Sequence, residues 1–382
     1  MQVLTDEQSM IRDTAGSFAA ARLAPGAAAR AAAGRIESDL IAEMAELGFL
    51  GMTVPEAMGG IGADYVSYAL ALMEIAGGDG AVSTMMSVHN APFCAILSRF
   101  ASPEQRELWL RPAAGGAFIG AFALTEPHTG SDAAAIRAQA RRDGAEYVLD
   151  GTKQFITSAR ICGGMIAFAV TDPAAGKRGI SAFYLPAGTP GLSIGTPEHK
   201  LGQHASDTCA VRFDNLRIDE SHRIGAEGQG LAIALSSLEV GRIGIAAQSV
   251  GMAQAALEIA VAYAQQRVTF GKPIADHQAV AFRLADMDTQ IEAARQLVLN
   301  AARLKDTGAD CLREASIAKL FASQMAERVV SDAIQTLGGY GYLADFPLER
   351  IYRDVRVCQI YEGTSDVQRI NISRALLGTR RS

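Results

Sequence analysis

The sequence predicts a mostly α-helical protein with a small antiparallel β domain in the middle of the chain. Four of its twelve prolines lie between residues 173 and 197, and only Pro273 and Pro347 follow them. Because proline breaks helix interiors, the long proline-free stretches rich in helix-forming residues indicate helices. A chain of 382 residues is too long for one small core. We therefore expect three domains, over residues 1–119, 120–227 and 228–382.

The first of these segments contains clear helix starts. Thr5 and Gln8 have the spacing of a capping box, in which each side chain bonds the backbone of the other residue. Ser102 and Gln105 form a second such pair, with Pro103 at the first helical position. Residues 36–49 space their apolar side chains by three and four, which is typical of an amphipathic helix. These signals predict a helical N-terminal domain.

The middle segment has the pattern of strands. Short apolar runs alternate with turns rich in glycine, proline and aspartate, and they read FIGAFAL, EYVLDG, MIAFAV, GISAFYL and CAVRF. Such alternation predicts a small antiparallel β domain. Residues 228–266 and 274–340 return to helical composition, and Asp276 is the expected N-cap of the helix that starts with HQAVAF.

Composition and charge narrow the functional classes. The apolar fraction is 49%, the charged fraction 20% and the net charge −6, which argues against nucleic acid or an anionic membrane as the main partner. The five cysteines are scattered, so neither a disulfide framework nor a metal site is expected. Glu239, Arg242 and Glu258 interrupt the longest apolar run, so we expect no membrane span. The N-terminus is a poor signal peptide, and we expect a cytoplasmic protein, or a mitochondrial-matrix one in a eukaryote.

The segment IYEGTSDVQR, residues 360–369, carries the strongest candidate for chemistry. It places Glu362 between an aromatic residue and a Gly-Thr-Ser turn. A carboxylate held by a turn against apolar surface is a candidate general base, because loss of hydration raises its pKa towards neutrality. The alternative is an ordinary helix start with Ser365 or Asp366 as N-cap. The two interpretations are compatible, because a helix N-terminus can also bind an anion.

Five blocks of sequence together give the chain a resemblance to a known family. They are the segment above and ALTEPHTGSD (123–132), KQFITSA (153–159), QRVTFGKPI (266–274) and QTLGGYGY (335–342). In order and spacing they resemble the acyl-CoA dehydrogenases, FAD enzymes, across nearly the whole chain. The resemblance implies a helical domain, a small antiparallel β-barrel or sandwich, and a C-terminal four-helix bundle, with FAD between the last two.

The resemblance assigns two stretches of the β domain to the flavin. Residues 122–131 match the segment that wraps it, with Phe122 and Leu124 inside that segment, the Thr125 hydroxyl facing the ring, and Ser131 a phosphate or acyl-CoA contact. Phe155, Ile156 and Thr157 match the aromatic-Ile-Thr that covers one flavin face, although many members carry tryptophan where this chain has Phe155. The ordinary alternative for residues 122–131 is the end of a strand. For Phe155 it is a core position in a strand.

Further cofactor residues implied by the resemblance come from the C-terminal half. Arg267 and Phe270 fit the arginine block that binds the FAD pyrophosphate of a neighbouring subunit, a role that suits the planar guanidinium. The remaining matches are His277 and Gln278 on the adenine side, Gln335, Gly338 and Gly339 in the glycine-rich turn, and Thr364 and Asp366 after the catalytic turn. A shared FAD site implies an oligomer, for which the resemblance favours a homotetramer.

The family places its catalytic glutamate either in the turn or on the long helix directly before an arginine. The second position is Gly241 here, so Glu362 is the expected base. By resemblance, Glu239 and Arg242 are acyl-CoA contacts near the entrance, although a helix-surface ion pair is their ordinary alternative. Tyr361 and Gly363 complete the expected substrate residues, with Tyr361 filling volume near the α-carbon.

The resemblance implies α,β-dehydrogenation of a short-chain, possibly branched acyl-CoA, with electrons passed to electron-transfer flavoprotein. A flavin oxidase or monooxygenase and a non-catalytic flavin-binding scaffold are the alternatives. Two formal motif matches are set aside: GYGYLA (339–344) lacks the strand that a dinucleotide fingerprint follows, and GLSIG (191–195) lacks the strand and helix of a nucleophile elbow. His128 either contacts CoA phosphates or faces solvent.

Overall fold

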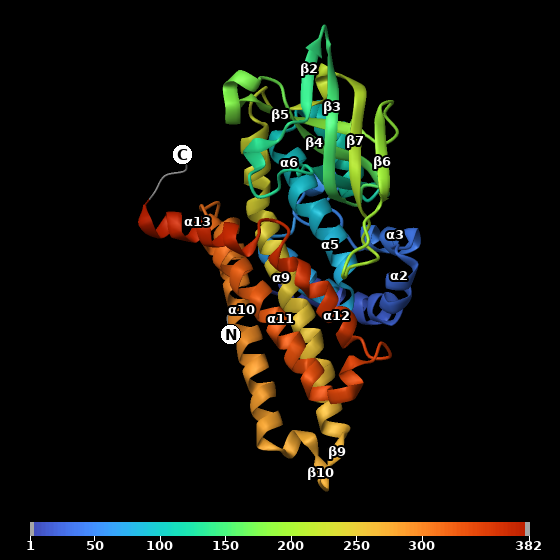
Figure 1. Cartoon of the computed structure of the whole chain (residues 1–382), viewed down its shortest axis with the longest axis vertical. Helices are drawn as coiled ribbons and strands as arrows, with labels where there is room; N and C mark the ends of the chain where they lie inside the picture. The colour runs from blue at the N-terminus through green and yellow to red at the C-terminus, as the bar shows by residue number, and fades with distance from the viewer. Residues whose placement is uncertain (1–3, 379–382) are drawn as a thin grey trace.

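The computed structural model describes residues 4–378, so the first three and last four residues of the expected end domains lie outside it. Figure 1 shows a β sheet at one end of the molecule and a small hairpin, β9 (Val268–Thr269) with β10 (Lys272–Pro273), at the other. Long helices run between these ends. The mostly helical fold with a central β domain is confirmed.

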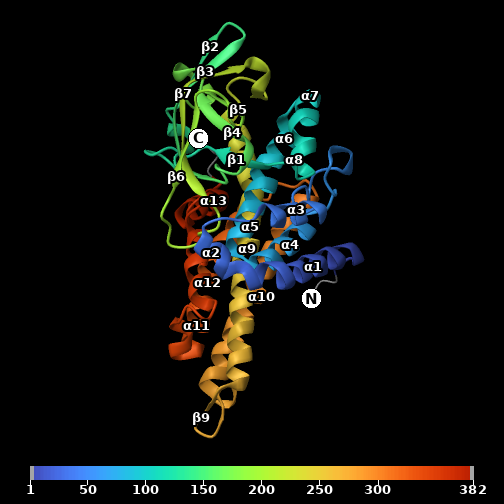
Figure 2. The ribbon, with the colours of Figure 1, turned by 90° about the vertical axis from the view of Figure 1, so that its right-hand side faces the viewer.

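The described part of the N-terminal segment is mainly helical, with a loop over residues 47–64 that holds one short 3-10 turn. Both expected capping boxes are present, at Thr5 with Gln8 and at Ser102 with Gln105. The helices here are α1 (Asp6–Phe18), α2 (Ala27–Ala33), α3 (Ser38–Glu46), α4 (Tyr65–Gly78), α5 (Gly80–Val88), α6 (Ala95–Phe100), α7 (Pro103–Gln105) and α8 (Arg111–Ala114). Figure 2 shows most of these helices to the right of the long helix α9 (Gly230–Gln266), with α5 in line with it and α2 to its left.

The middle segment forms one sheet in the order β6-β7-β3-β2-β4-β5-β8, with β1 paired to β4. Its strands are β1 (Ile119–Ala123), β2 (Gln139–Asp143), β3 (Glu146–Thr157), β4 (Cys162–Val170), β5 (Ile180–Pro186), β6 (Leu192–Pro197), β7 (Thr208–Asp219) and β8 (Arg223–Ile224). Of the two expected forms, a barrel or a sandwich, the described strands do not form a closed barrel, because β6 and β8 end the sheet without pairing with each other. The pairing is also not wholly antiparallel, since β4 runs parallel to β1 and β2.

The C-terminal segment packs α9 against α10 (Gln278–Asp306) and α11 (Leu312–Leu337). Two shorter helices, α12 (Leu348–Val355) and α13 (Ser365–Leu377), lie against α11. The expected N-cap of α10 is wrong: the cap is His277, and Asp276 ends a preceding 3-10 turn. The chain closes that turn first, so the helix starts one residue later than the sequence predicts.

Three apolar cores lie among the described residues: one joins the N-terminal and C-terminal helices, a second packs N-terminal helices and the start of α9 against the sheet, and a third lies within the β domain. Met44, Leu72, Ile243 and Val329 belong to the first core and are fully buried. The expectation that no segment is apolar enough to span a membrane is wrong by length and composition for α9, whose apolar window has a mean hydropathy of 1.4. That window is 67% buried inside the protein, as in a core helix.

Candidate functional site

A tight turn between α12 and α13 presents Glu362. Glu362 and Gly363 both have left-handed backbone, with φ of 55° and 87°. This conformation is uncommon for a residue with a Cβ, so the surrounding structure must hold it. The Thr364 hydroxyl then accepts the Val367 N–H at 3.3 Å and caps α13. The expectation that Ser365 or Asp366 caps this helix is therefore wrong by one or two residues.

This turn forms one wall of a cavity of about 710 Å³ between the β domain and the C-terminal helices. The opposite wall is the segment from Thr125 to Ser131, which includes His128. Expected site residues that line it together are Thr125, Ser131, Phe155, Thr157, Tyr361, Glu362, Gly363 and Thr364. Segments more than 200 residues apart in the sequence thus meet at one cavity.

Glu362 has the environment of a base with a raised pKa. Its Oε2 atom is inaccessible to solvent and has no hydrogen-bond partner among residues 4–378. Burial raises its pKa to about 7, while the positive charges of Arg242 and Lys319 act to lower it. The carboxylate lies against Gly241 of α9, where an added Cβ would sit 2.5 Å from Oε2. The carboxyl group is therefore poised to exchange a proton near neutral pH.

The β-domain wall is held by an ion pair that sequence reasoning missed. Glu126 and Lys153 are both buried, and the lysine Nζ donates to Glu126 Oε1 at 2.7 Å and to the Leu124 carbonyl at 3.1 Å. Glu126 also accepts the backbone N–H groups of Arg137 and Ala138. A lysine at an inward position of a strand is the signal that could have found this pair. These bonds fix the segment that carries Thr125.

Phe155 presents its ring to the cavity. It is 61% exposed, which is high for a large apolar side chain, and its φ is 59°. The neighbouring Ile156 points into the sheet core, whereas Thr157 lines the cavity. The exposed ring and the adjacent hydroxyl offer a flat apolar ligand one stacking surface and one polar contact.

Four expected residues do not line this cavity. Phe122 packs edge-on against Phe168, with ring centroids 5.2 Å apart, and Leu124 is buried. Ile156 is likewise in the core. Asp366 is exposed and pairs with Arg369 at 2.9 Å. Phe122, Leu124 and Ile156 therefore shape the wall from behind, through their backbone.

The remaining cofactor candidates lie together on a different part of the molecule. Arg267, Gly338 and Gly339 line a cavity of about 600 Å³ towards the β9–β10 end. Phe270, at the hairpin tip, is 96% exposed and its ring contacts His277. Gln278 starts α10 beside them, and Gln335 lies on the last turn of α11. Within one chain, this group and Glu362 share no described cavity.

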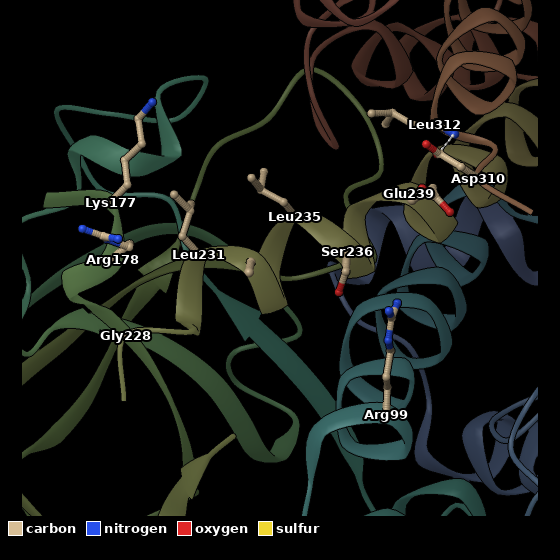
Figure 3. Close-up of a pocket in the computed structure, with 11 residues that line it drawn as sticks. Arg99, Lys177, Arg178, Gly228, Leu231, Leu235, Ser236, Glu239, Asp310 and Leu312 are labelled. Carbon is tan, nitrogen blue, oxygen red and sulfur yellow. Dashed lines mark hydrogen bonds between the residues drawn. The ribbon is translucent and has the colours of Figure 1, made fainter. Parts of the chain in front are cut away.

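Glu239 and Arg242, which were expected at one site, lie at different places in the structure. Arg242 is buried and its charge acts on Glu362. Glu239 instead lines a third cavity of about 520 Å³, which Figure 3 shows between the loop with Lys177 and the start of α11. There it accepts a hydrogen bond from Lys305 at 2.8 Å. Among residues 4–378, no cluster of histidine, cysteine or acidic side chains could hold a metal ion.

Models of known protein families match most of the chain. Models of the acyl-CoA dehydrogenase N-terminal, middle and C-terminal domains match residues 5–117, 121–216 and 228–377. The chain belongs to the acyl-CoA dehydrogenase family. Its members are FAD-dependent oxidoreductases, and the predicted family, cofactor and enzyme class are confirmed.

Individual members of the family align with the acyl-CoA dehydrogenase described here along its whole length. An acyl-CoA dehydrogenase of Bacillus subtilis is 47% identical, over 98% of this chain and 99% of its own. The structure of butyryl-CoA dehydrogenase from Megasphaera elsdenii has a TM-score of 0.97 and 41% identity, covering 99% of this chain and 100% of its own. A chain in the structure reported as "Electron transferring flavoprotein of Acidaminococcus fermentans" has a TM-score of 0.97 and 43% identity, covering 99% of both.

The residues around the 710 Å³ cavity fit the family's cofactor. The exposed Phe155 ring offers a surface for a flat ring system, and the Thr125 and Thr157 hydroxyls offer hydrogen bonds. Glu362, whose Oε2 atom is buried and has no hydrogen-bond partner among the described residues, lines the same cavity. The cavity thus brings together an exposed aromatic ring and a buried carboxyl group.

Proposed function

We propose that this protein oxidises a short-chain, straight or modestly branched acyl-CoA to the trans-2-enoyl-CoA, with Glu362 as the base that removes the α-proton. The observation that carries the proposal is the inaccessible Oε2 atom of Glu362, which has no hydrogen-bond partner among the described residues, at a cavity that also exposes Phe155. A base works best when its pKa lies near the working pH, and the pKa of Glu362 is raised to about 7.

Each residue of the turn has a separate task in this reaction. The Glu362 carboxylate takes the α-proton, and its own backbone N–H would donate to the thioester oxygen, where negative charge develops. FAD, when bound, supplies the hydride acceptor for the β-carbon. Gly363 keeps the turn narrow because an added Cβ would meet the Gln368 amide at 2.8 Å. The base alone contributes a rate enhancement on the order of 10²–10⁴-fold.

A buried polar network closes the cavity behind Tyr361 and supports a short acyl group. The Tyr361 hydroxyl donates to Gln248, whose amide donates to Thr84 at 2.6 Å, and Thr84 donates to Gln203 at 2.7 Å. Gln248 is fully buried. Opening this wall for a longer chain would leave several buried polar groups unpaired, which is costly. We infer that the pocket accepts about the length of a butyryl group.

We infer that FAD is shared between two copies of this chain in a homotetramer. Thr125, Ser131, Phe155, Thr157 and Thr364 would hold its flavin side, together with backbone around Phe122, Leu124, Ile156 and Asp366. The pyrophosphate and adenine side would be held by Arg267, Phe270, His277, Gln278, Gln335, Gly338 and Gly339 of the other copy. The separation of these two groups within one chain supports the sharing. Arg242, Tyr361 and Gly363 would contact the acyl-CoA, with Ser131 towards its CoA end.

We propose electron-transfer flavoprotein as the electron acceptor, supported by the likeness to a chain from the Acidaminococcus fermentans structure. We further propose a cytoplasmic location and no nucleic-acid or membrane partner. His128 bonds the Ala135 carbonyl at 3.0 Å, which supports a role in holding its own loop. Nothing here favours the oxidase or scaffold alternatives over dehydrogenation.

The test is an anaerobic titration of the purified flavoprotein with butyryl-CoA, followed by flavin absorbance. Wild type should bleach promptly, and Glu362→Gln should retain FAD but lose bleaching by on the order of 10²–10⁴ in rate. Equal bleaching in both would remove Glu362 as the base. Bleaching by butyryl-CoA followed by fast reoxidation in air would instead favour an oxidase.

A further inference from the structure

A buried lysine holds the turn that carries Glu362. Lys319 lies on α11 and is fully buried. Its Nζ donates to the backbone carbonyl of Tyr361 at 2.8 Å and to that of Gly363 at 2.5 Å. These are the carbonyl groups directly before and after Glu362. One ammonium group therefore clamps the backbone on both sides of the proposed base.

The two hydrogen bonds of Lys319 stabilise a strained part of the backbone. Glu362 and Gly363 are consecutive left-handed residues, a conformation that the chain alone does not favour. The buried Gln368 amide adds a second holder, because it donates to the Glu362 carbonyl at 3.3 Å and to the Gly363 carbonyl at 2.8 Å. Gln368 lies on α13, directly after the turn, whereas Lys319 lies on α11. Of the two side chains, only Lys319 therefore connects the turn to α11.

Lys319 also brings charge to the site. The groups that face Glu362 are Arg242 on α9, Lys319 on α11 and the Tyr68 phenol on α4. Burial lowers the pKa of Lys319 to about 8, so the amine is still mainly protonated at pH 7. Its positive charge favours the ionised form of Glu362, and so does that of Arg242. Burial of the carboxyl group opposes both charges.

We propose that Lys319 is a positioning residue for the reaction: it fixes the turn of Glu362 through two backbone carbonyls, and its charge favours the ionised form of that buried carboxyl group. The proposal rests on the role of Glu362 given above. Lys319 itself touches no reacting atom, because both of its hydrogen bonds go to backbone. Removing its charge must raise the proton affinity of Glu362.

The experiment compares Lys319→Met, Lys319→Gln and Lys319→Arg with wild type. Ser316→Ala is the matched control, because Ser316 lies one turn earlier on α11, is fully buried and accepts a hydrogen bond from Asn371 on α13. The first readout is an infrared pH titration of the Glu362 carboxyl band, identified by its loss in Glu362→Gln. The second is the limiting rate of anaerobic flavin reduction by butyryl-CoA.

We expect the infrared midpoint of Glu362 to move up by about one pH unit in Lys319→Met and Lys319→Gln, which is about tenfold in proton affinity. It should stay at the wild-type value in Lys319→Arg and Ser316→Ala. The reduction rate at pH 7 should fall about 10- to 100-fold in Lys319→Met with FAD retained. If Lys319→Met does not fold, Lys319→Gln decides, because its neutral amide removes the charge and keeps a hydrogen-bond donor on a side chain that is one bond shorter.

A wild-type infrared midpoint in Lys319→Gln or Lys319→Met would overturn the proposal, even with a slower reaction. Failure of the proposed function is a different result. In that case wild type and Glu362→Gln would reduce flavin equally, or wild type would not react with butyryl-CoA at all. The carboxyl titration would still report on Lys319.

Discussion

Gly241 and Glu362 form a matched pair across the site. The glycine leaves room on α9 for the carboxylate, and an added Cβ would come within 2.5 Å of Oε2. Real Cβ atoms do not approach an oxygen so closely, so the carboxylate would have to move. A displacement of about 1 Å at a reacting group can cost on the order of 100-fold in rate. The position of the base therefore depends on the absence of a side chain opposite it.

Gly241→Ala should slow flavin reduction by butyryl-CoA about 10- to 100-fold while FAD stays bound, because only the carboxylate is displaced. Stopped-flow absorbance measures this rate. Gly244→Ala is the control on the same helix, since its Cβ would meet Ser87 Oγ at 2.7 Å and not Glu362. Equal rates in the two variants would mean that the contact with Gly241 does not set the position of the base.

Short motifs predicted the residues that come to the cavity, but not their partners. Thr125, Phe155, Tyr361 and Glu362 line it together as the sequence blocks imply. Lys319 was missed because its bonds reach more than 40 residues along the chain, and no local pattern encodes such a contact. Glu239 was expected beside Arg242 but lies at another cavity.

Helix geometry separates Glu239 from Glu362, which lies against Gly241. Each residue turns a helix by about 100°, so Glu239 points about 200° away from Gly241. Sequence proximity on a helix therefore did not place Glu239 near Glu362. Its ion pair with Lys305 is the ordinary alternative that the sequence had left open.

At the scale of helices and strands, the close contact of α4 with α9 joins the N-terminal and C-terminal cores. An added Cβ at Gly251 of α9 would overlap the Met73 carbonyl of α4. The obstacle is backbone, which cannot rotate away as a side chain can. This contact fixes how near the two helices approach, and thereby the frame on which Gly241 sits.

Gly251→Ala should lower the free energy of unfolding by about 1–3 kcal/mol through overpacking. Gly77→Ala, on the facing helix, should be neutral or slightly stabilising, because its Cβ would meet Gly251 O at 3.4 Å and Ala255 at 3.8 Å. Thermal unfolding followed by circular dichroism measures both. A Gly251→Ala protein as stable as Gly77→Ala would contradict this picture of the α4–α9 contact.

Periodicity and proline spacing predicted the succession of helices, strands and helices, and both capping boxes at Thr5 and Ser102 were confirmed. The shape of the sheet was not predicted. Strand pairing depends on long-range contacts, and the parallel neighbours of β4 come from different parts of the segment. Helix caps next to irregular turns were also misplaced, as at Asp276, because the preceding turn decides where the helix begins.

At the scale of the whole molecule, the β9–β10 hairpin lies at the end opposite the β sheet (Figure 1). Its exposed Phe270 and the nearby Arg267, whose guanidinium lies 5.7 Å from the Tyr340 ring centre, offer a surface for a second chain. A charged guanidinium with an aromatic neighbour suits a phosphorylated ligand. The full cofactor site would then exist only in the assembled oligomer.

Arg267→Ala should weaken FAD binding at least tenfold by removing a charge-assisted phosphate contact. The flavin content after gel filtration and the FAD dissociation constant measure this change, with light scattering to follow the tetramer. Arg212→Ala, at an exposed position of β7, should leave both unchanged. An Arg267→Ala protein with wild-type FAD affinity would contradict the sharing of the cofactor between chains.

The measurement that tests the central claim most directly is the pH dependence of the limiting rate of flavin reduction by butyryl-CoA in a single anaerobic turnover. The base must be ionised to accept a proton, and burial raises the pKa of Glu362 to about 7. The rate should therefore fall as the pH drops through about 7 and level off above it. This dependence should vanish from the residual rate of Glu362→Gln. A rate independent of pH across this range, or the same midpoint in Glu362→Gln, would contradict the assignment of Glu362 as the base.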